Sequence, residues 1–178
     1  MSWVFQYGSN ATRARLLGPR RLNGHGVVIG SAETIDDYTI AFDVESRTNG
    51  CAASDLRLTP GRKAWGVLYD IPDEFIRGRR SDRQRTLEEV EGPNYEERKI
   101  PVRPRGGEPD DAVTFVVRPD QRATNLFTGV WYVSWIVYGL REHGVPEDYI
   151  AHVIEVAMET NRRAGSTGQQ QNELIRRL

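Results

Sequence analysis

One carboxylate in the sequence is placed to carry a proton. Glu91 lies four residues after Leu87, so on a helix the two side chains share one face. Leu87 together with Val90 makes this the face that should point inward. Glu91 would also lie at the negative end of the helix dipole, and partial burial disfavours the charged form as well. Both effects raise the pKa of a glutamate towards the range useful in general acid–base catalysis. The alternative is an exposed glutamate in a frayed last turn.

A helix must hold this carboxylate in place, and the flanking residues mark its two ends. Ser81, with Gln84 three residues later, fits a capping box. Gly92 fits the position just after the last turn of a helix. We therefore predict a helix that begins near Ser81 and ends at Glu91.

A second group of residues, Gly8, Ser9 and Asn10, could bind an anion. They form a turn between an apolar, aromatic run at residues 3–7, typical of a buried strand, and a helix predicted over residues 11–17. Ser9 or Asn10 is placed to cap that helix. Such a turn leaves backbone N–H groups free, and Gly8 can adopt a positive φ and let a ligand approach closely. The turn therefore suits a carboxylate or a phosphate; the alternative is an ordinary strand-to-helix turn.

The remaining elements form the body that carries both groups. Apolar and alternating runs predict strands at residues 27–29, 38–44, 64–71 and 112–117. Two helices follow: a largely buried one over residues 130–140, with Trp131 and Trp135 in the core, and one that opens at Pro146. A chain with its strands first and its helices last is typical of an α+β domain rather than of alternating βαβ units.

The totals indicate one domain, which we place at residues 1–163, followed by a flexible tail at residues 164–178. Residues 164–172 are rich in Gly, Ser and Gln, and the short apolar end at residues 174–178 could dock back or fray. A net charge of −1 favours neither nucleic acid nor an anionic membrane as a partner. The single cysteine, Cys51, excludes an internal disulfide framework and fits a reducing compartment. Because no secretory signal is visible and no apolar run is long enough to span a bilayer, we expect a cytoplasmic protein.

No metal or cofactor site is predicted. His25, His143 and His152 are far apart, and none has a companion at metal-ligand spacing. Cys51 has no evident basic neighbour that would lower the pKa of its thiol. The arginines of residues 77–85 have the acidic residues Asp82, Glu88 and Glu89 as neighbours, which is typical of a solvated helix face rather than of a nucleic-acid site.

The order and spacing of these motifs resemble those of the γ-glutamylcyclotransferase family. The likeness rests on Tyr7-Gly8-Ser9-Asn10 after the first strand, Trp65-Gly66-Val67-Leu68-Tyr69 in a later strand, and Glu91-Gly92 at the end of the next helix.

Further stretches extend the resemblance over about residues 3–160. Tyr95 and Arg98 match a Tyr and a basic residue that often follow the Glu-Gly of the family. The small-residue loop at residues 49–53 resembles the segment before the Trp-Gly strand of the family, and residues 139–149 are similar to the C-terminal helices of its dipeptide-acting branch.

The resemblance implies a small closed mixed β-barrel with helices packed around it, two C-terminal helices and no cofactor. Members of this family cyclise a γ-glutamyl group to 5-oxoproline and release the amine. By this resemblance Glu91 would be the catalytic acid and base, and Tyr95 would line the pocket. The residues that would hold the substrate α-carboxylate, largely through main-chain N–H groups, are Tyr7, Gly8, Ser9 and Asn10. The expected partner is a small γ-glutamyl molecule, with no nucleic acid and no membrane, and we allow for a homodimer.

Two departures from the family pattern leave alternatives open. Gln6 stands where the family usually has a small residue, and Ala11 stands where a Leu commonly follows the Asn. The same fold could therefore serve as a non-catalytic module that binds a small carboxylate or the end of a peptide. A third alternative is a protein-interaction domain that works through the apolar C-terminal end.

Overall fold

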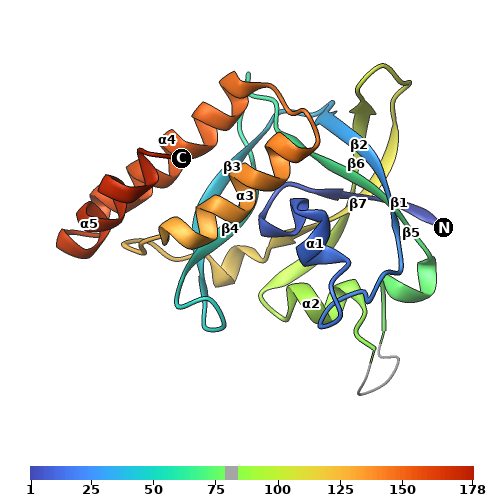
Figure 1. The fold of residues 1–178 in the computed structure, drawn as a ribbon, viewed down its shortest axis with the longest axis horizontal. Helices are drawn as coiled ribbons and strands as arrows, with labels where there is room; N and C mark the ends of the chain where they lie inside the picture. The colour runs from blue at the N-terminus through green and yellow to red at the C-terminus, as the bar shows by residue number, and fades with distance from the viewer. Residues whose placement is uncertain (79–83) are drawn as a thin grey trace.

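The computed structural model describes residues 1–78 and 84–178 (Figure 1). Its strands are β1 (Ser2–Gln6), β2 (Val27–Thr34), β3 (Tyr38–Ser46), β4 (Cys51–Leu58), β5 (Trp65–Ile71), β6 (Tyr95–Pro104) and β7 (Asp110–Val117). Its α-helices are α1 (Arg13–Leu16), α2 (Leu87–Glu91), α3 (Val130–Glu142), α4 (Glu147–Arg163) and α5 (Ser166–Ile175). Short 3₁₀ helices are η1 (Ser9–Ala11), η2 (Asp73–Phe75) and η3 (Pro119–Gln121).

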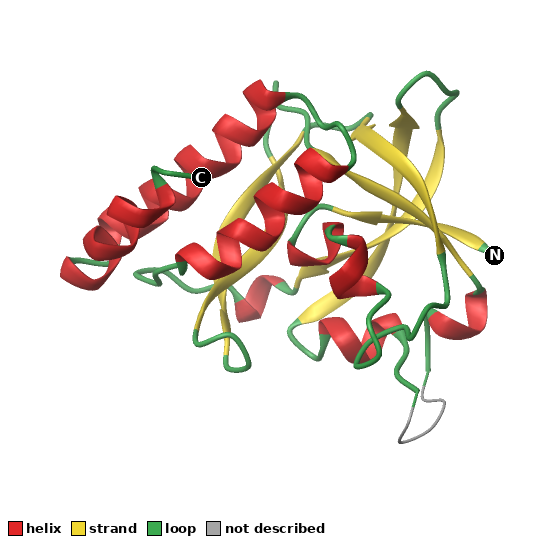
Figure 2. Ribbon diagram, in the orientation of Figure 1, coloured by secondary structure: helices red, strands yellow, loops and turns green. Residues whose placement is uncertain are grey.

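Five of the strands follow one another around a ring. Their order is β1-β5-β2-β6-β7, and β7 returns to β1 through a parallel pairing at Val4 and Val113. The other neighbouring strands in the ring pair antiparallel. β3 and β4 form a separate two-stranded ribbon, which Figure 2 shows between the ring and the helices α3 and α4. The predicted α+β class is therefore confirmed.

The start of the chain is tied to the ring by buried side chains. The hydroxyl of Tyr69 on β5 donates to Ala11 O at 2.9 Å, and the hydroxyl of Tyr7 donates to Phe115 O on β7 at 2.6 Å. Helix α3 packs on the same turn at Gly139, where an added Cβ would lie 2.5 Å from the Thr12 backbone nitrogen. The segment after β1 is thus held between the ring and a helix from the far end of the sequence.

Helix α2 is shorter than the sequence predicted. Its first residue is Leu87, and Thr86 caps it: Thr86 Oγ1 accepts from the Glu89 nitrogen at 3.4 Å, and the Thr86 nitrogen donates to Glu89 Oε2 at 3.0 Å. The capping box is therefore formed by Thr86 and Glu89, and the predicted cap at Ser81 lies outside the described residues. The predicted end is confirmed, since Gly92 follows the last turn with a φ of 85°.

The C-terminal region differs from the prediction of two helices and a flexible tail. Three helices, α3, α4 and α5, lie together on one side of the molecule (Figure 1). Residues 164–178 include α5, whose Ile175 is fully buried and whose Asn172 Nδ2 donates to Met158 O at 3.0 Å. Gly168 lets α5 approach α4 closely, because an added Cβ would lie 2.1 Å from Asn161 O. Composition predicted mobility, but packing against α4 fixes this segment as a helix.

Helix α3 is buried on one side only. Trp131 and Trp135 were predicted in the core, yet they are 44% and 37% exposed, whereas Val133 and Ile136 are fully buried. The prediction was wrong because apolar residues occupy both faces of this helix. Within the described residues, no helix is both long and apolar enough to cross a membrane.

Candidate active site

All six predicted site residues line one small cavity of about 30 Å³. They come from the first turn and from the end of α2 and the start of β6, and they are Tyr7, Gly8, Ser9, Asn10, Glu91 and Tyr95. The cavity is continuous in its lining with an outer cavity of about 750 Å³, since Ser9, Asn10, Glu91 and Tyr95 belong to the walls of both. The structure therefore brings the acidic side chain and the first turn together.

Gly8 is required for space rather than for a positive φ. Its φ is −101° and its ψ is −154°, so the expected left-handed conformation is not adopted. An added Cβ would lie only 2.3 Å from Ser54 Oγ on β4. The glycine thus lets the ribbon β3–β4 approach the first turn, so that Ser54 becomes part of the cavity lining.

The first turn offers unpaired backbone donors. Among the described residues, none accepts a hydrogen bond from the backbone N–H of Ser9 or of Asn10. The sequence predicted that Ser9 or Asn10 would cap a helix, but neither side chain does so. Ser9 Oγ instead accepts from Arg15 Nε at 3.2 Å, and Asn10 turns its carboxamide towards Glu91. Both amides are therefore unpaired in the described part of the chain, and both residues line the cavity.

Glu91 is half-buried and hydrogen-bonded to the first turn. Its Oε1 accepts from Asn10 Nδ2 at 2.8 Å. Burial raises the pKa of the Glu91 carboxyl, while the Asn10 hydrogen bond and the positive charges of Arg21 and Arg15 act in the opposite direction. The net direction is upward, as the sequence predicted, so the group is suited to both accepting and returning a proton.

Three phenols surround the carboxylate. Tyr95 donates to Ser54 O at 2.8 Å, and Tyr132 Oη accepts from the Ser54 nitrogen at 3.1 Å. Burial raises the pKa of Tyr7, Tyr95 and Tyr132, so all three stay neutral near neutral pH. They enclose Glu91 without adding charge.

Sequence reasoning missed several of the residues that line the site. Tyr132 lies in an apolar helix and resembles a core residue, and Ser54 lies one position beyond the small-residue loop that was noted. Arg15 and Arg21 also line the outer cavity, and Arg15 lies over the Trp135 ring at 5.7 Å. Their only sequence signal is the closeness of two basic residues to the Gly-Ser-Asn turn.

Arg98, which extended the sequence resemblance, is not part of this site. It is exposed and pairs with Glu96 at 2.8 Å on the outside of β6. Within the part of the chain that the structure describes, no group of three or more His, Cys, Asp or Glu side chains could hold a metal ion.

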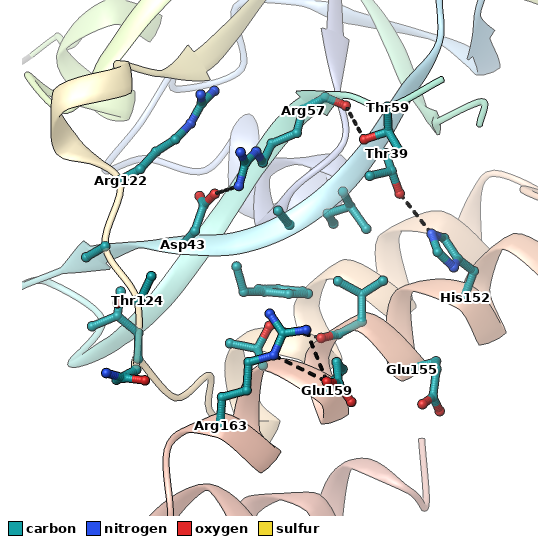
Figure 3. A pocket seen from close by; sticks show the side chains of 18 of the residues that line it. Thr39, Asp43, Arg57, Thr59, Arg122, Thr124, His152, Glu155, Glu159 and Arg163 are labelled. Carbon is teal, nitrogen blue, oxygen red and sulfur yellow. Dashed lines mark hydrogen bonds and ion pairs between the residues drawn. The ribbon is translucent and has the colours of Figure 1, made fainter. Parts of the chain in front are cut away.

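A second cavity of about 670 Å³ lies between β3 and α4 (Figure 3). Asp43 pairs with Arg57 at 3.2 Å, and Thr39 Oγ1 lies 2.9 Å from His152 Nε2 across the gap. Burial raises the pKa of Asp43 to about 6. None of the six predicted residues reaches this cavity, although Arg122 lines both it and the outer cavity of the first site.

Comparison with known proteins gives a family and a fold. Residues 63–153 match the model of the AIG2-like family. No curated protein matches the sequence. Among solved structures, a gamma-glutamyl cyclotransferase has a TM-score of 0.74 at 18% identity, with 99% of each chain covered.

Two further structures share the fold. An uncharacterized protein from Homo sapiens has a TM-score of 0.67 at 19% identity, with 85% of each chain covered. YkqA from Bacillus subtilis has a TM-score of 0.65 at 22% identity, covering 87% of this chain and 54% of that one. The present chain thus spans about half the length of YkqA.

Proposed function

The chain belongs to the AIG2-like family, and on this premise we propose that it is a γ-glutamylcyclotransferase. It would convert a γ-glutamyl amino acid or a γ-glutamyl amine to 5-oxoproline and the free amine. The observation that carries the proposal is the single cavity lined by both Glu91 and the unpaired amides of Ser9 and Asn10.

The first turn would bind the α-carboxylate of the γ-glutamyl group. The free N–H groups of Ser9 and Asn10 suit an anion, and the guanidinium of Arg15 stands next to Ser9. The γ-amide would then extend past Glu91 into the outer cavity, which has room for the leaving amine.

The reaction needs one group that moves a proton. Ionised Glu91 takes a proton from the substrate α-ammonium, and the freed amine attacks the γ-carbonyl carbon of the same molecule. A C–N bond forms in a five-membered ring, and the ring nitrogen gives up a second proton by way of Glu91. The original amide C–N bond breaks, and the leaving amine takes up both protons and departs as an ammonium ion. Atoms and charge balance without any other reactant.

Geometry supplies most of the acceleration in such a reaction. Well-oriented intramolecular reactions reach effective molarities of about 10⁵–10⁸ M, so a site that holds the reactive conformation gains much of the rate by orientation. General acid–base transfer adds about 100- to 10,000-fold. A pocket with one carboxylate, an anion-binding turn and neutral phenols is therefore sufficient.

A panel of γ-glutamyl dipeptides and γ-glutamyl amines tests the proposal. Each compound is incubated with the folded protein, and 5-oxoproline is measured directly by mass spectrometry. We expect product from at least one class of compound. If none yields product but a γ-glutamyl compound still binds, the chain is a non-catalytic carboxylate-binding module of the same fold.

A further inference from the structure

Arg21 reaches the candidate active site through Asn10. Its Nη1 donates to Asn10 Oδ1 at 2.6 Å, and Asn10 Nδ2 donates to Glu91 Oε1 at 2.8 Å. Side chains from three separate segments thus form one chain of hydrogen bonds that ends on the carboxylate. We propose that Arg21 is a positioning residue: it fixes the Asn10 carboxamide, which in turn holds Glu91 in its reactive orientation. The catalytic part of this inference rests on the proposed function.

The orientation of the Asn10 carboxamide follows from the chemistry at its two ends. An arginine side chain can only donate hydrogen bonds, so the oxygen of the amide must face Arg21. The amide N–H₂ then faces Glu91, where an ionised carboxylate can accept. The reversed amide would place N–H against the guanidinium and oxygen against the carboxylate, which are two repulsive contacts. Arg21 therefore selects the one orientation that stabilises ionised Glu91.

The structure holds Arg21 in place, and among the described residues its guanidinium forms a hydrogen bond with Asn10 but no ion pair. In the described residues, no carboxylate forms an ion pair with Arg21. Burial, followed by the charge of Arg15, lowers the pKa of Arg21 to about 10, so it remains cationic at neutral pH. The main chain on either side is anchored, since the Arg21 nitrogen donates to Gly18 O at 3.0 Å and Leu22 is fully buried. A partly buried cation that forms no ion pair with a described residue lowers the stability of the fold, which points to a role in the site.

The electrostatic effect of Arg21 falls on Glu91. Burial raises the pKa of the carboxyl, and the Asn10 hydrogen bond and the charge of Arg21 are the two largest opposing influences. Without Arg21, Glu91 would have one positive charge fewer in its surroundings. The side-chain amide of Asn10 would also be free to rotate into the reversed orientation. Among the described residues, Arg15, Tyr7, Tyr95 and Tyr132 also interact electrostatically with Glu91. Further charged residues that line the outer cavity with it are Glu45, Arg47, Arg85, Glu89, Asp120 and Arg122. Burial keeps the phenols neutral, so Glu91 is the group expected to titrate on the acid side of the rate profile.

Steady-state kinetics separate positioning from a structural role. For Arg21→Gln we expect kcat to fall about 10- to 100-fold, with KM within about threefold of the wild type. The acid-side pKa of the kcat profile should rise, because ionised Glu91 is less stabilised. Arg21→Lys keeps the charge and the donors and should recover part of both losses. Arg20→Gln, at the exposed neighbouring position, is the matched control and should behave as the wild type.

Two kinetic outcomes would overturn the inference. One is an Arg21→Gln variant whose kcat and pH profile equal those of the wild type. The other is a loss confined to KM with an unchanged pH profile, because Arg21 would then contact the substrate instead of orienting Glu91.

A titration that needs no turnover keeps this inference distinct from the proposed function. With ¹³C-labelled glutamate, the Glu91 carboxyl resonance is assigned by its absence in Glu91→Gln and followed with pH. We expect a higher Glu91 pKa in folded Arg21→Gln than in the wild type or in Arg20→Gln. An unchanged Glu91 pKa contradicts the positioning role, whether or not any γ-glutamyl compound is a substrate. A raised Glu91 pKa in a protein that forms no 5-oxoproline supports the positioning role and contradicts only the proposed enzymatic activity.

Discussion

Replacing Gly8 with alanine should damage the site through crowding, and the structure says where the crowding falls. The new Cβ would lie 2.3 Å from Ser54 Oγ, about 1 Å closer than an ordinary contact. Ser54 is buried and its Oγ lies 3.1 Å from Tyr132 Oη, so it cannot move away freely. Overpacking of this kind costs about 1–3 kcal/mol in the free energy of unfolding.

A second substitution identifies the cause of that loss. In Gly8→Ala/Ser54→Ala the clashing oxygen is absent, and the nearest remaining atom would be Ser54 Cβ at 3.5 Å, an ordinary contact. Ser54→Ala alone should cost about 0.5–1.5 kcal/mol for its hydrogen bond. The double variant should therefore be more stable than the sum of the two single losses implies, by about 1 kcal/mol or more.

Urea unfolding of the four proteins, followed by circular dichroism, measures these differences. An unfolding free energy of Gly8→Ala within 0.5 kcal/mol of the wild type, taken as about the size of an ordinary surface substitution, would refute the reasoning. So would a double variant with simply additive losses, because the requirement for glycine would then lie in the backbone conformation of residue 8 rather than in the space beside Ser54.

Two further predictions concern stability. The pKa of Asp43 rises from 3.8 to about 6 on folding, so its stabilising contribution is present below pH 4 and is lost as the pH rises through about 6. Asp43→Asn should remove this loss and gain at most about 3 kcal/mol at pH 7.5, a figure that already includes the attraction of Arg57 and is reduced by solvent screening. The same decline with pH in urea unfolding of both proteins would contradict this. Gly168→Ala should lower the free energy of unfolding by about 1–3 kcal/mol, because its Cβ would meet Asn161 O at 2.1 Å; a thermal unfolding midpoint equal to that of the wild type would show that α5 is not tightly packed.

Short sequence motifs predicted those parts of the candidate site that are formed by residues close together in the sequence. The Gly-Ser-Asn turn and the Gly92 stop are short-range features, and the structure places both where they were predicted. The apolar face shared by Leu87 and Glu91 likewise indicated that the carboxylate would point inward.

Contacts between distant segments could not be predicted in this way. Arg21 meets Asn10 only because the loop after α1 folds back over the first turn, and Ser54 meets Gly8 only because the β3–β4 ribbon packs against it. The position of Tyr132 depends on α3 crossing the same place. None of these contacts leaves a periodic pattern in the sequence.

Composition misjudged two segments for a related reason. The Gly- and Gln-rich residues 164–178 indicated a mobile tail, but Gly168 is the small residue that lets α5 pack on α4. The aromatic residues of α3 indicated full burial, although Trp131 and Trp135 lie on its exposed face. In both segments, burial depends on which face of the helix packs against another element. The sequence of the helix alone does not determine that face.

The most direct test of the central claim compares 5-oxoproline formation by the wild type and by Glu91→Gln, with Glu88→Gln as the matched control. Glu88 is exposed on the same helix, and a glutamine there can still accept from the Gly78 nitrogen. We predict a loss in kcat of about 100- to 10,000-fold for Glu91→Gln, with substrate binding largely kept, and no such loss for Glu88→Gln. Full turnover by folded Glu91→Gln would contradict the role of this carboxylate as the proton carrier.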